Sequence, residues 1–139
     1  MIIHALNPAL VAVIWNKING YLDNALKSAE FDIRYNIDDL YNDIINGNYV
    51  CWIAADKNEI KAAAVTGIVE HPHGNSVYIF LVGGIDINCW CDEMQNAFVD
   101  YAKQHNARWI DALVRPGFAR FLGGKYGYKK LTEMISCEV

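Results

Sequence analysis

The sequence lacks two features that would send a protein into or across a membrane. No apolar run among its 139 residues approaches the roughly 20 residues that span a bilayer. Residues 1–12 contain no Lys or Arg, so they lack the basic region with which a secretory signal peptide begins. These absences predict a cytoplasmic protein without a membrane segment. Because there is also no internal repeat, linker or low-complexity stretch, residues 1–139 are expected to form one domain.

Cysteine is scarce, and its spacing argues against structural roles. The four cysteines are Cys51, Cys89, Cys91 and Cys137. In a chain without a secretory signal the thiols are expected to be free, so no disulfide is predicted. One residue separates Cys89 from Cys91, whereas a zinc half-site needs roughly two to four, so no metal site is predicted. On a helix these two sulfurs would lie about 200° apart, which predicts one buried and one exposed thiol.

Basic residues are fewer than acidic ones, and many of them lie near the end of the chain. The sequence has 12 Lys and Arg against 16 Asp and Glu, and this acidic balance predicts no binding to nucleic acid. Five cations, Arg115, Arg120, Lys125, Lys129 and Lys130, follow one another with no acid between them. Two interpretations stay open: a solvated face, or a basic patch that receives an anionic ligand or an acidic partner.

Residues 76–105 contain the pattern around which the rest of the chain is arranged. Residues 77–82 are apolar at both odd and even positions, so both faces of a strand formed by them would be apolar. This predicts a strand covered on both faces. After Gly83-Gly84 an amphipathic helix is expected to run to about His105. Such a strand and helix predict a βαβ unit, and ligands usually bind at the turn between them. The residues expected in the core include Trp52, Trp90 and Trp109.

The remaining elements are expected to flank this unit. Helices should open at Asn7-Pro8 and at Asn36, where side chains suited to N-caps occur. The predicted strands cover residues 2–5, 49–55, 60–69, 109–114 and 128–139, and a short helix opens at Arg115-Pro116 and ends at Gly123-Gly124. The fold class is therefore α/β (α+β), a mixed central sheet with the element order β-α-α-β-β-β-α-β-α-β.

This order resembles the GCN5-related N-acetyltransferase (GNAT) fold over nearly the whole chain. Tyr101-Ala102-Lys103 would close its main helix, and Gly127-Tyr128 would enter its last strand. The resemblance implies that acetyl-CoA, or another acyl-CoA, lies between two central strands and that amides at the start of the main helix hold its pyrophosphate. It also implies acetyl transfer to an amine. Val82 and Gly83 are the cofactor-binding candidates on this basis.

This sequence does not contain the phosphate-binding motif of the family, Gln/Arg-x-x-Gly-x-Gly/Ala, at the expected position. Asp86 stands at the basic or amide position, and Cys89 and Cys91 stand at the two small positions. Residues 84–93 contain no Lys, Arg or Gln. An aspartate at a pyrophosphate site repels the ligand by on the order of 1 kcal/mol even through water. The loop is therefore predicted to be degenerate, with acetyl transfer impaired or absent.

The second family motif, Asn-x-x-Ala-x-x-x-Tyr-x-x-x-Gly-Phe, keeps its packing residues and loses its chemical ones. Ala119 and Gly127-Tyr128 match it, while Pro116 and Gly123 replace the asparagine and the tyrosine. In the family that tyrosine often protonates the departing thiolate. The catalytic candidates that remain are a substitute acid, Tyr126 or Tyr128, and a general base from Glu70, His71 or His73.

One further resemblance concerns the origin of the chain. Leu81-Val82-Gly83-Gly84 followed by Trp90 looks like small GNAT-like proteins encoded by bacteriophages, some of which travel with virion-assembly genes. This implies a scaffold in the host cytoplasm or the virion, with a phage or host protein as partner. Trp90 would either fill the vacated cofactor cleft or anchor that partner. Three functions stay open: a GNAT-like protein with impaired transfer, an active N-acyltransferase and a virion-associated or other binding scaffold.

Overall fold

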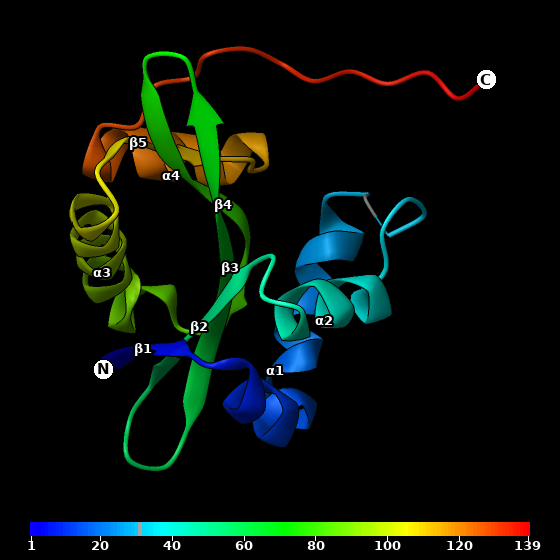
Figure 1. The fold of residues 1–139 in the computed structure, drawn as a ribbon, viewed down its shortest axis with the longest axis vertical. Coiled ribbons are helices and arrows are strands. Elements are labelled where there is room, and N and C mark those ends of the chain that lie inside the picture. Colours follow the sequence, from blue (N-terminus) through cyan, green and yellow to red (C-terminus); the bar gives the residue numbers. More distant parts are fainter. Residues whose placement is uncertain (31) are drawn as a thin grey trace.

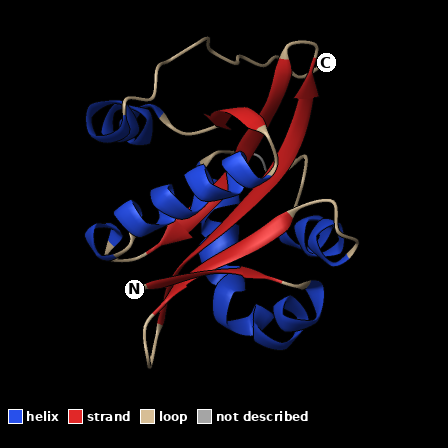
Figure 2. Ribbon diagram, turned by 60° about the vertical axis from the view of Figure 1, so that its left-hand side comes forward, coloured by secondary structure: helices blue, strands red, loops and turns tan. Residues whose placement is uncertain are grey.

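The computed structural model describes residues 1–30 and 32–139. Its centre is a five-stranded sheet in the order β1-β2-β3-β4-β5, with helices on both faces (Figures 1 and 2). The strands are β1 (Ile2–Leu6), β2 (Val50–Ala55), β3 (Ile60–His71), β4 (Gly74–Gly84) and β5 (Ala107–Ala112). The helices are α1 (Pro8–Ser28), α2 (Ile37–Ile45), α3 (Cys91–Gln104), α4 (Pro116–Tyr126) and a short 3-10 helix, η1 (Ile87–Cys89).

The predicted caps start the first two helices. The Asn7 side chain accepts a hydrogen bond from the Leu10 amide at 2.9 Å, and Pro8 occupies the first turn, where its missing N–H costs nothing. Asn36 and Asp39 form a reciprocal capping box at the start of α2. Within residues 1–30 and 32–139, no helix combines the length and apolar character needed to cross a membrane.

The chain direction in the sheet follows the predicted order. Strands β1 to β4 form an antiparallel meander, and α3 then crosses back so that β5 runs parallel to β4. The pairing of β3 with β4 shifts at one point: Val65 faces Leu81, and the next residue, Thr66, faces Ile79. Phe80 is therefore an extra residue in β4, a β-bulge in the middle of the central strand.

The two faces of the sheet have separate cores. Under α1 and α2 the core is mainly aliphatic, and its fully buried members include Val11, Ile18, Leu22, Leu26 and Leu40. Helix α1 packs so closely on the sheet that a Cβ added at Gly83 would lie 2.2 Å from the Tyr21 carbonyl oxygen. The core under α3 is rich in aromatic and sulfur-containing side chains, Trp52, Trp90, Cys91, Met94 and Phe98. Here the Trp52 indole N–H donates to Thr66 Oγ1 at 2.9 Å.

Three sequence predictions near the end of the chain are wrong. Residues 128–139 form no strand, because after α4 and Gly127 the chain does not return to β5 but runs across the molecule toward the α2 side (Figure 1). Gly123-Gly124 does not end α4, since both residues stay helical and Gly127, at φ +75°, provides the left-handed C-cap. Trp109 does not fill the core: its side chain is 39% exposed, with the Arg108 guanidinium over its ring.

Candidate active site between strands β4 and β5

The site begins where the two parallel strands stop pairing. Their last paired residues are Ile79 and Ala112, and the Leu113 amide donates to the Ile79 carbonyl oxygen at 3.3 Å. The Phe80 bulge follows at once, and in the described chain residues 80–84 have no pairing with β5. The strands therefore diverge into a wedge that is open toward α3 and α4.

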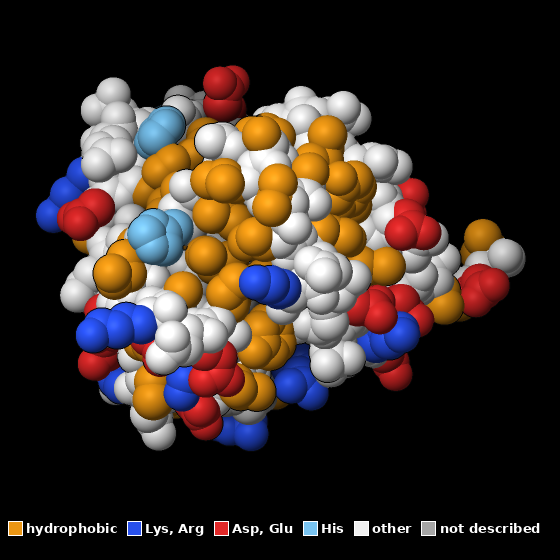
Figure 3. All heavy atoms as spheres, turned by 90° about the horizontal axis from the view of Figure 1, so that it is seen from below, with side chains coloured by type: hydrophobic (Ala, Val, Ile, Leu, Met, Phe, Trp, Pro, Cys, Tyr) orange, Lys and Arg blue, Asp and Glu red, His pale blue; other side chains and the backbone are white. Residues whose placement is uncertain are grey.

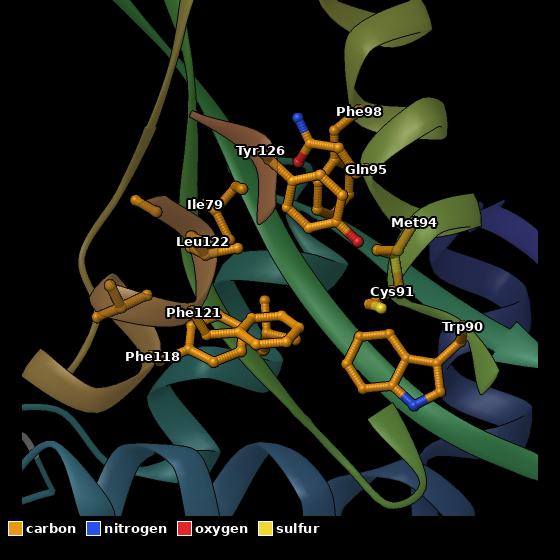
Figure 4. A pocket seen from close by; sticks show the side chains of 13 residues that line it. Ile79, Trp90, Cys91, Met94, Gln95, Phe98, Phe118, Phe121, Leu122 and Tyr126 are labelled. Atoms are coloured by element: carbon orange, nitrogen blue, oxygen red, sulfur yellow. The ribbon is translucent and has the colours of Figure 1, made fainter. Parts of the chain in front are cut away.

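Side chains from four elements fill most of this wedge and leave a cavity of about 30 Å³ (Figure 4). This is room for about two water molecules. Its wall is mainly apolar and consists of Ile79, Val82, Trp90, Cys91, Met94, Gln95, Phe98, Ala112, Val114, Phe118, Phe121, Leu122 and Tyr126. A pantetheine arm has many more atoms than this space can hold. With the side chains in these positions, the wedge does not fit the cofactor arm.

Trp90 contributes much of the closure. It caps the N-terminus of α3, its side chain is 4% exposed, and its indole N–H donates to the Ile85 carbonyl oxygen at 2.7 Å. In this structure the Trp90 ring is buried in the wall of the wedge and presents little surface to another protein. Whether it anchors a partner or fills a cofactor cleft stays a prediction.

Two amides in the loop from Gly84 to Trp90 bond to carbonyl oxygens of the same loop. The amides of Cys89 and Trp90 donate to the carbonyl oxygens of Asp86 (2.8 Å) and Ile87 (3.2 Å), closing the η1 turn. Asp86 adopts a left-handed conformation at φ +53°, and its carboxylate forms a 2.9 Å ion pair with Lys61 of β3. A pyrophosphate would therefore meet an acidic loop with two of its amides already bonded, which does not fit that anion.

A polar cluster forms one side of the cavity. The Lys125 ammonium lies 3.4 Å from Cys91 Sγ and 3.4 Å from the Asp92 carboxylate, and the Tyr126 hydroxyl donates to Asp92 at 2.6 Å. Figure 4 shows Cys91 between the rings of Trp90 and Tyr126. Burial and the hydrogen bond to Asp92 raise the pKa of Tyr126 well above its ordinary value, so the phenol keeps its proton. A thiol, an ammonium, a phenol and a carboxylate thus meet at α3 and α4.

The other predicted site residues lie apart from this cluster. Glu70, His71 and His73 are at the β3–β4 turn, where His71 Nε2 is 3.0 Å from Ser76 Oγ. His71 pairs with Gly74, five positions before Ile79, which is about 17 Å along a strand. None of the three lines the cavity. Val82 does line it, whereas Gly83 packs against α1 on the other face.

The sequence pointed to Tyr126 but missed its neighbours. In the sequence, Lys125 stood out only as one member of a basic run. Cys91 stood out only as a residue that does not fit the phosphate-loop motif. These residues are 34 positions apart, so no local pattern brings them together. As predicted, one of the two neighbouring thiols is buried and the other exposed; the buried one is Cys91. Across the described residues, no group of three or more His, Cys, Asp or Glu side chains could hold a metal ion.

The comparisons with known proteins bear on the fold. No protein-family model and no curated protein matches the sequence. Among solved structures, a predicted acetyltransferase with acetyl-CoA from Clostridium acetobutylicum matches at a TM-score of 0.70, with 20% identity over 99% of this chain and 95% of that one. The chain has the GNAT fold.

Two other GNAT-fold structures agree with this one. An aminoglycoside acetyltransferase from an uncultured soil metagenomic sample matches at a TM-score of 0.73, with 13% identity over 99% of this chain and 97% of that one. A ribosomal-protein-alanine N-acetyltransferase from Brucella melitensis biovar Abortus 2308 matches at 0.71, with 8% identity over all of both chains. At identities this low, the structural matches show a shared fold and nothing finer. That fold, GNAT, is the one the sequence predicted.

Proposed function

We propose that this chain is a GNAT-fold protein in which acyl-CoA binding and acetyl transfer are impaired or absent. The observation that carries the proposal is Trp90, whose buried ring helps to reduce the wedge between β4 and β5 to about 30 Å³. Two loop amides that are already bonded and the Asp86 carboxylate add to it, because they leave fewer free donors and place negative charge where a pyrophosphate would lie. The resemblance to phage GNAT-like proteins supports a phage origin and a place in the host cytoplasm or virion.

Calorimetric titration of the whole chain with acetyl-CoA and with CoA tests this proposal. We expect no saturation at millimolar ligand. Micromolar binding would overturn the proposal and favour an active acyl-CoA-dependent N-acyltransferase, for which the β4 bulge, the diverging strands and the Tyr126 hydroxyl are already in place. A thiol-release assay with amine acceptors would then measure transfer directly.

Trp90→Leu tests whether the indole is what closes the wedge. Trp52→Leu is a matched control, because it also removes a buried indole with a satisfied N–H but does not line the cavity. If Trp90 blocks the cofactor, its replacement should strengthen acetyl-CoA binding about tenfold or more, an effect of about 1.4 kcal/mol, while the control stays at the wild-type level. Equal behaviour of the two variants would assign the impairment to the loop instead.

A binding role is the second candidate, and a surface at one end of the molecule favours it. Strand β1 and the first turns of α1 lie in the lower half of Figure 1, above the β2–β3 turn, and apolar side chains cover much of the face seen from below (Figure 3). Three exposed residues of these elements, Ile2, Leu10 and Val13, define what we term the β1–α1 surface, and Val13 is 75% exposed. Exposed apolar surface of this kind is typical of protein interfaces.

Site-specific photo-crosslinking tests the β1–α1 surface. A photoreactive residue at Val13 should give a discrete cross-linked product in the cells that make the protein. The same residue at Lys57, in the exposed β2–β3 turn, is the control and should give none. The absence of a product from Val13 would count against a partner at this surface.

A further inference from the structure

Cys91 combines burial with access to an internal space. It is the first residue of α3, its side chain is 5% exposed, and it forms part of the cavity wall. Cys89, two residues earlier, is exposed and lies outside that wall. The pair therefore offers two thiols that are close in sequence and differ in surroundings.

The surroundings of Cys91 stabilise negative charge on its sulfur. The Lys125 ammonium donates to Sγ at 3.4 Å, and the N-terminus of α3 adds the partial positive charge of its unpaired amides. Asp92 offsets part of this charge, but Tyr126 donates its hydroxyl to the same carboxylate and so weakens that competition. This geometry places positive charge beside a sulfur that borders the cavity, which suits a nucleophilic side chain.

The cavity beside the sulfur determines what it can accept. Its lining is almost entirely apolar, and its 30 Å³ would hold a group of only a few heavy atoms. A short acyl chain meets both conditions. A pyrophosphate would meet the Asp86 carboxylate and two loop amides that are already bonded, so the acyl donor that suits this site is a small thioester without one.

We propose that Cys91 is an acylation site that takes a short acyl group from a small acyl thioester. The Cys91 thiolate attacks the thioester carbonyl carbon and forms a new sulfur–carbon bond. The tetrahedral intermediate collapses, the bond from carbon to the donor sulfur breaks, and the donor leaves as a thiolate. The proton lost by Cys91 on ionisation balances the one that the departing thiolate takes up, and Lys125 is placed to hold the charge throughout.

This inference goes beyond the proposed function, because it requires neither acyl-CoA binding nor a protein partner. Its failure would leave the calorimetric result with acetyl-CoA untouched. The choice of a donor without pyrophosphate does rest on the proposed function, so micromolar acetyl-CoA binding would overturn that choice, whereas acetylation of Cys91 is measured separately.

Incubation with S-acetyl-N-acetylcysteamine, followed by intact-mass and peptide-mapping mass spectrometry, tests the proposal. One acetyl group should appear on Cys91, at a rate about tenfold above that of the exposed Cys89, although accessibility alone predicts the opposite order. Neutral hydroxylamine should remove the group, as it does from a thioester. Acetylation confined to Cys89 or Cys137, or no adduct at all, would overturn the proposal.

Three variants locate the effect. Cys91→Ser should abolish the adduct, and Cys89→Ser should leave its rate unchanged. Lys125→Met keeps the length of a part-exposed side chain and removes the ammonium, so it should slow acetylation of Cys91 about tenfold without disturbing the fold. An unchanged rate in Lys125→Met would show that the cluster does not activate the thiol, and would contradict the proposal even if Cys91→Ser failed to fold.

Discussion

The two faces of the sheet are covered by cores with different kinds of side chain. The core under α1 and α2 is mainly aliphatic, and its central residues have no exposed surface. The core under α3 and α4 has aromatic rings among its buried members, contains Cys91 in contact with Lys125, and keeps a cavity. Tight packing of branched side chains supplies stability, whereas a space with polar groups around it supplies a place for chemistry. The comparison predicts that the first face contributes more to stability and that the second holds the candidate site.

A pair of leucines gives the largest effect with which to test this assignment. Leu22 of α1 is fully buried in the first core, and Leu122 of α4 lies beside the existing cavity. Leu22→Ala should lower the free energy of unfolding by about 3 to 4 kcal/mol, and Leu122→Ala by about 2 kcal/mol, because less of its contact shell is occupied. Urea unfolding measures both. Equal losses would show that the two faces carry stability alike.

A pair of glycines sharpens the same contrast. Gly83→Ala would place a Cβ 2.2 Å from the Tyr21 carbonyl oxygen, so α1 must shift, at a cost of about 2 kcal/mol. Gly124→Ala, in the middle of α4, meets nothing within 4 Å and should stabilise the protein by about 0.5 to 1 kcal/mol through helix propensity. Thermal unfolding monitored by circular dichroism distinguishes the two. A neutral Gly83→Ala would contradict the close approach of α1.

Each face also has one tyrosine–aspartate pair, and the two should respond differently to salt. Hydrogen bonds from Tyr35 and Asn48 lower the pKa of Asp43, whereas Tyr126 and the Lys125 ammonium lower the pKa of Asp92. Since both folded-state pKa values lie below the unfolded ones, each pair stabilises the fold above the ordinary aspartate pKa. This stabilisation is lost as the pH falls through the folded-state value.

Carboxyl NMR titrations check this prediction. Added salt should raise the pKa of Asp92, whose ion pair with Lys125 is exposed to screening, and should change that of Asp43 less, because its partners are neutral. Tyr35→Phe should raise the pKa of Asp43. Equal salt shifts at the two carboxyls would remove the distinction.

The smallest effect is expected from the end of the chain. Residues 131–139 are exposed along their whole length, so their deletion should change the free energy of unfolding by less than about 0.5 kcal/mol. Deletion of residues 1–6, which removes all of β1, is a contrasting truncation that should cost much more, because β1 pairs with β2. A loss above about 1 kcal/mol on removing residues 131–139 would indicate that they pair with β5 in solution.

Local patterns in the sequence were enough to predict most of the fold. The caps at Asn7 and Asn36, the doubly apolar central strand and the helical crossover each act within a few residues, and all appear as predicted. The last strand did not, because its residues are suited to a strand but pairing depends on the direction that the chain takes after Gly127. Propensity does not determine that direction.

Less of the candidate site could be predicted, because it too depends on how segments distant in the sequence pack together. Asp86 and Trp90 could be recognised as misfits in a phosphate loop from sequence alone. That Trp90 turns inward depends on the Ile85 carbonyl oxygen and on rings from α4, and the contact between Lys125 and Cys91 depends on how α4 packs against α3. Such contacts between segments that are distant in the sequence do not produce a periodic sequence pattern, so they could not be predicted from one.

The placement of Trp90 also gives the molecule an internal optical probe. Its ring and the Cys91 side chain belong to the same cavity wall, whereas Trp52 lies outside that wall and Trp109 is at the surface. An occupant of the cavity would alter the polarity around the Trp90 indole and shift its emission, while the other tryptophans report little change. The difference in fluorescence between the wild type and Trp90→Phe therefore follows the filling of the wedge in real time, without any label.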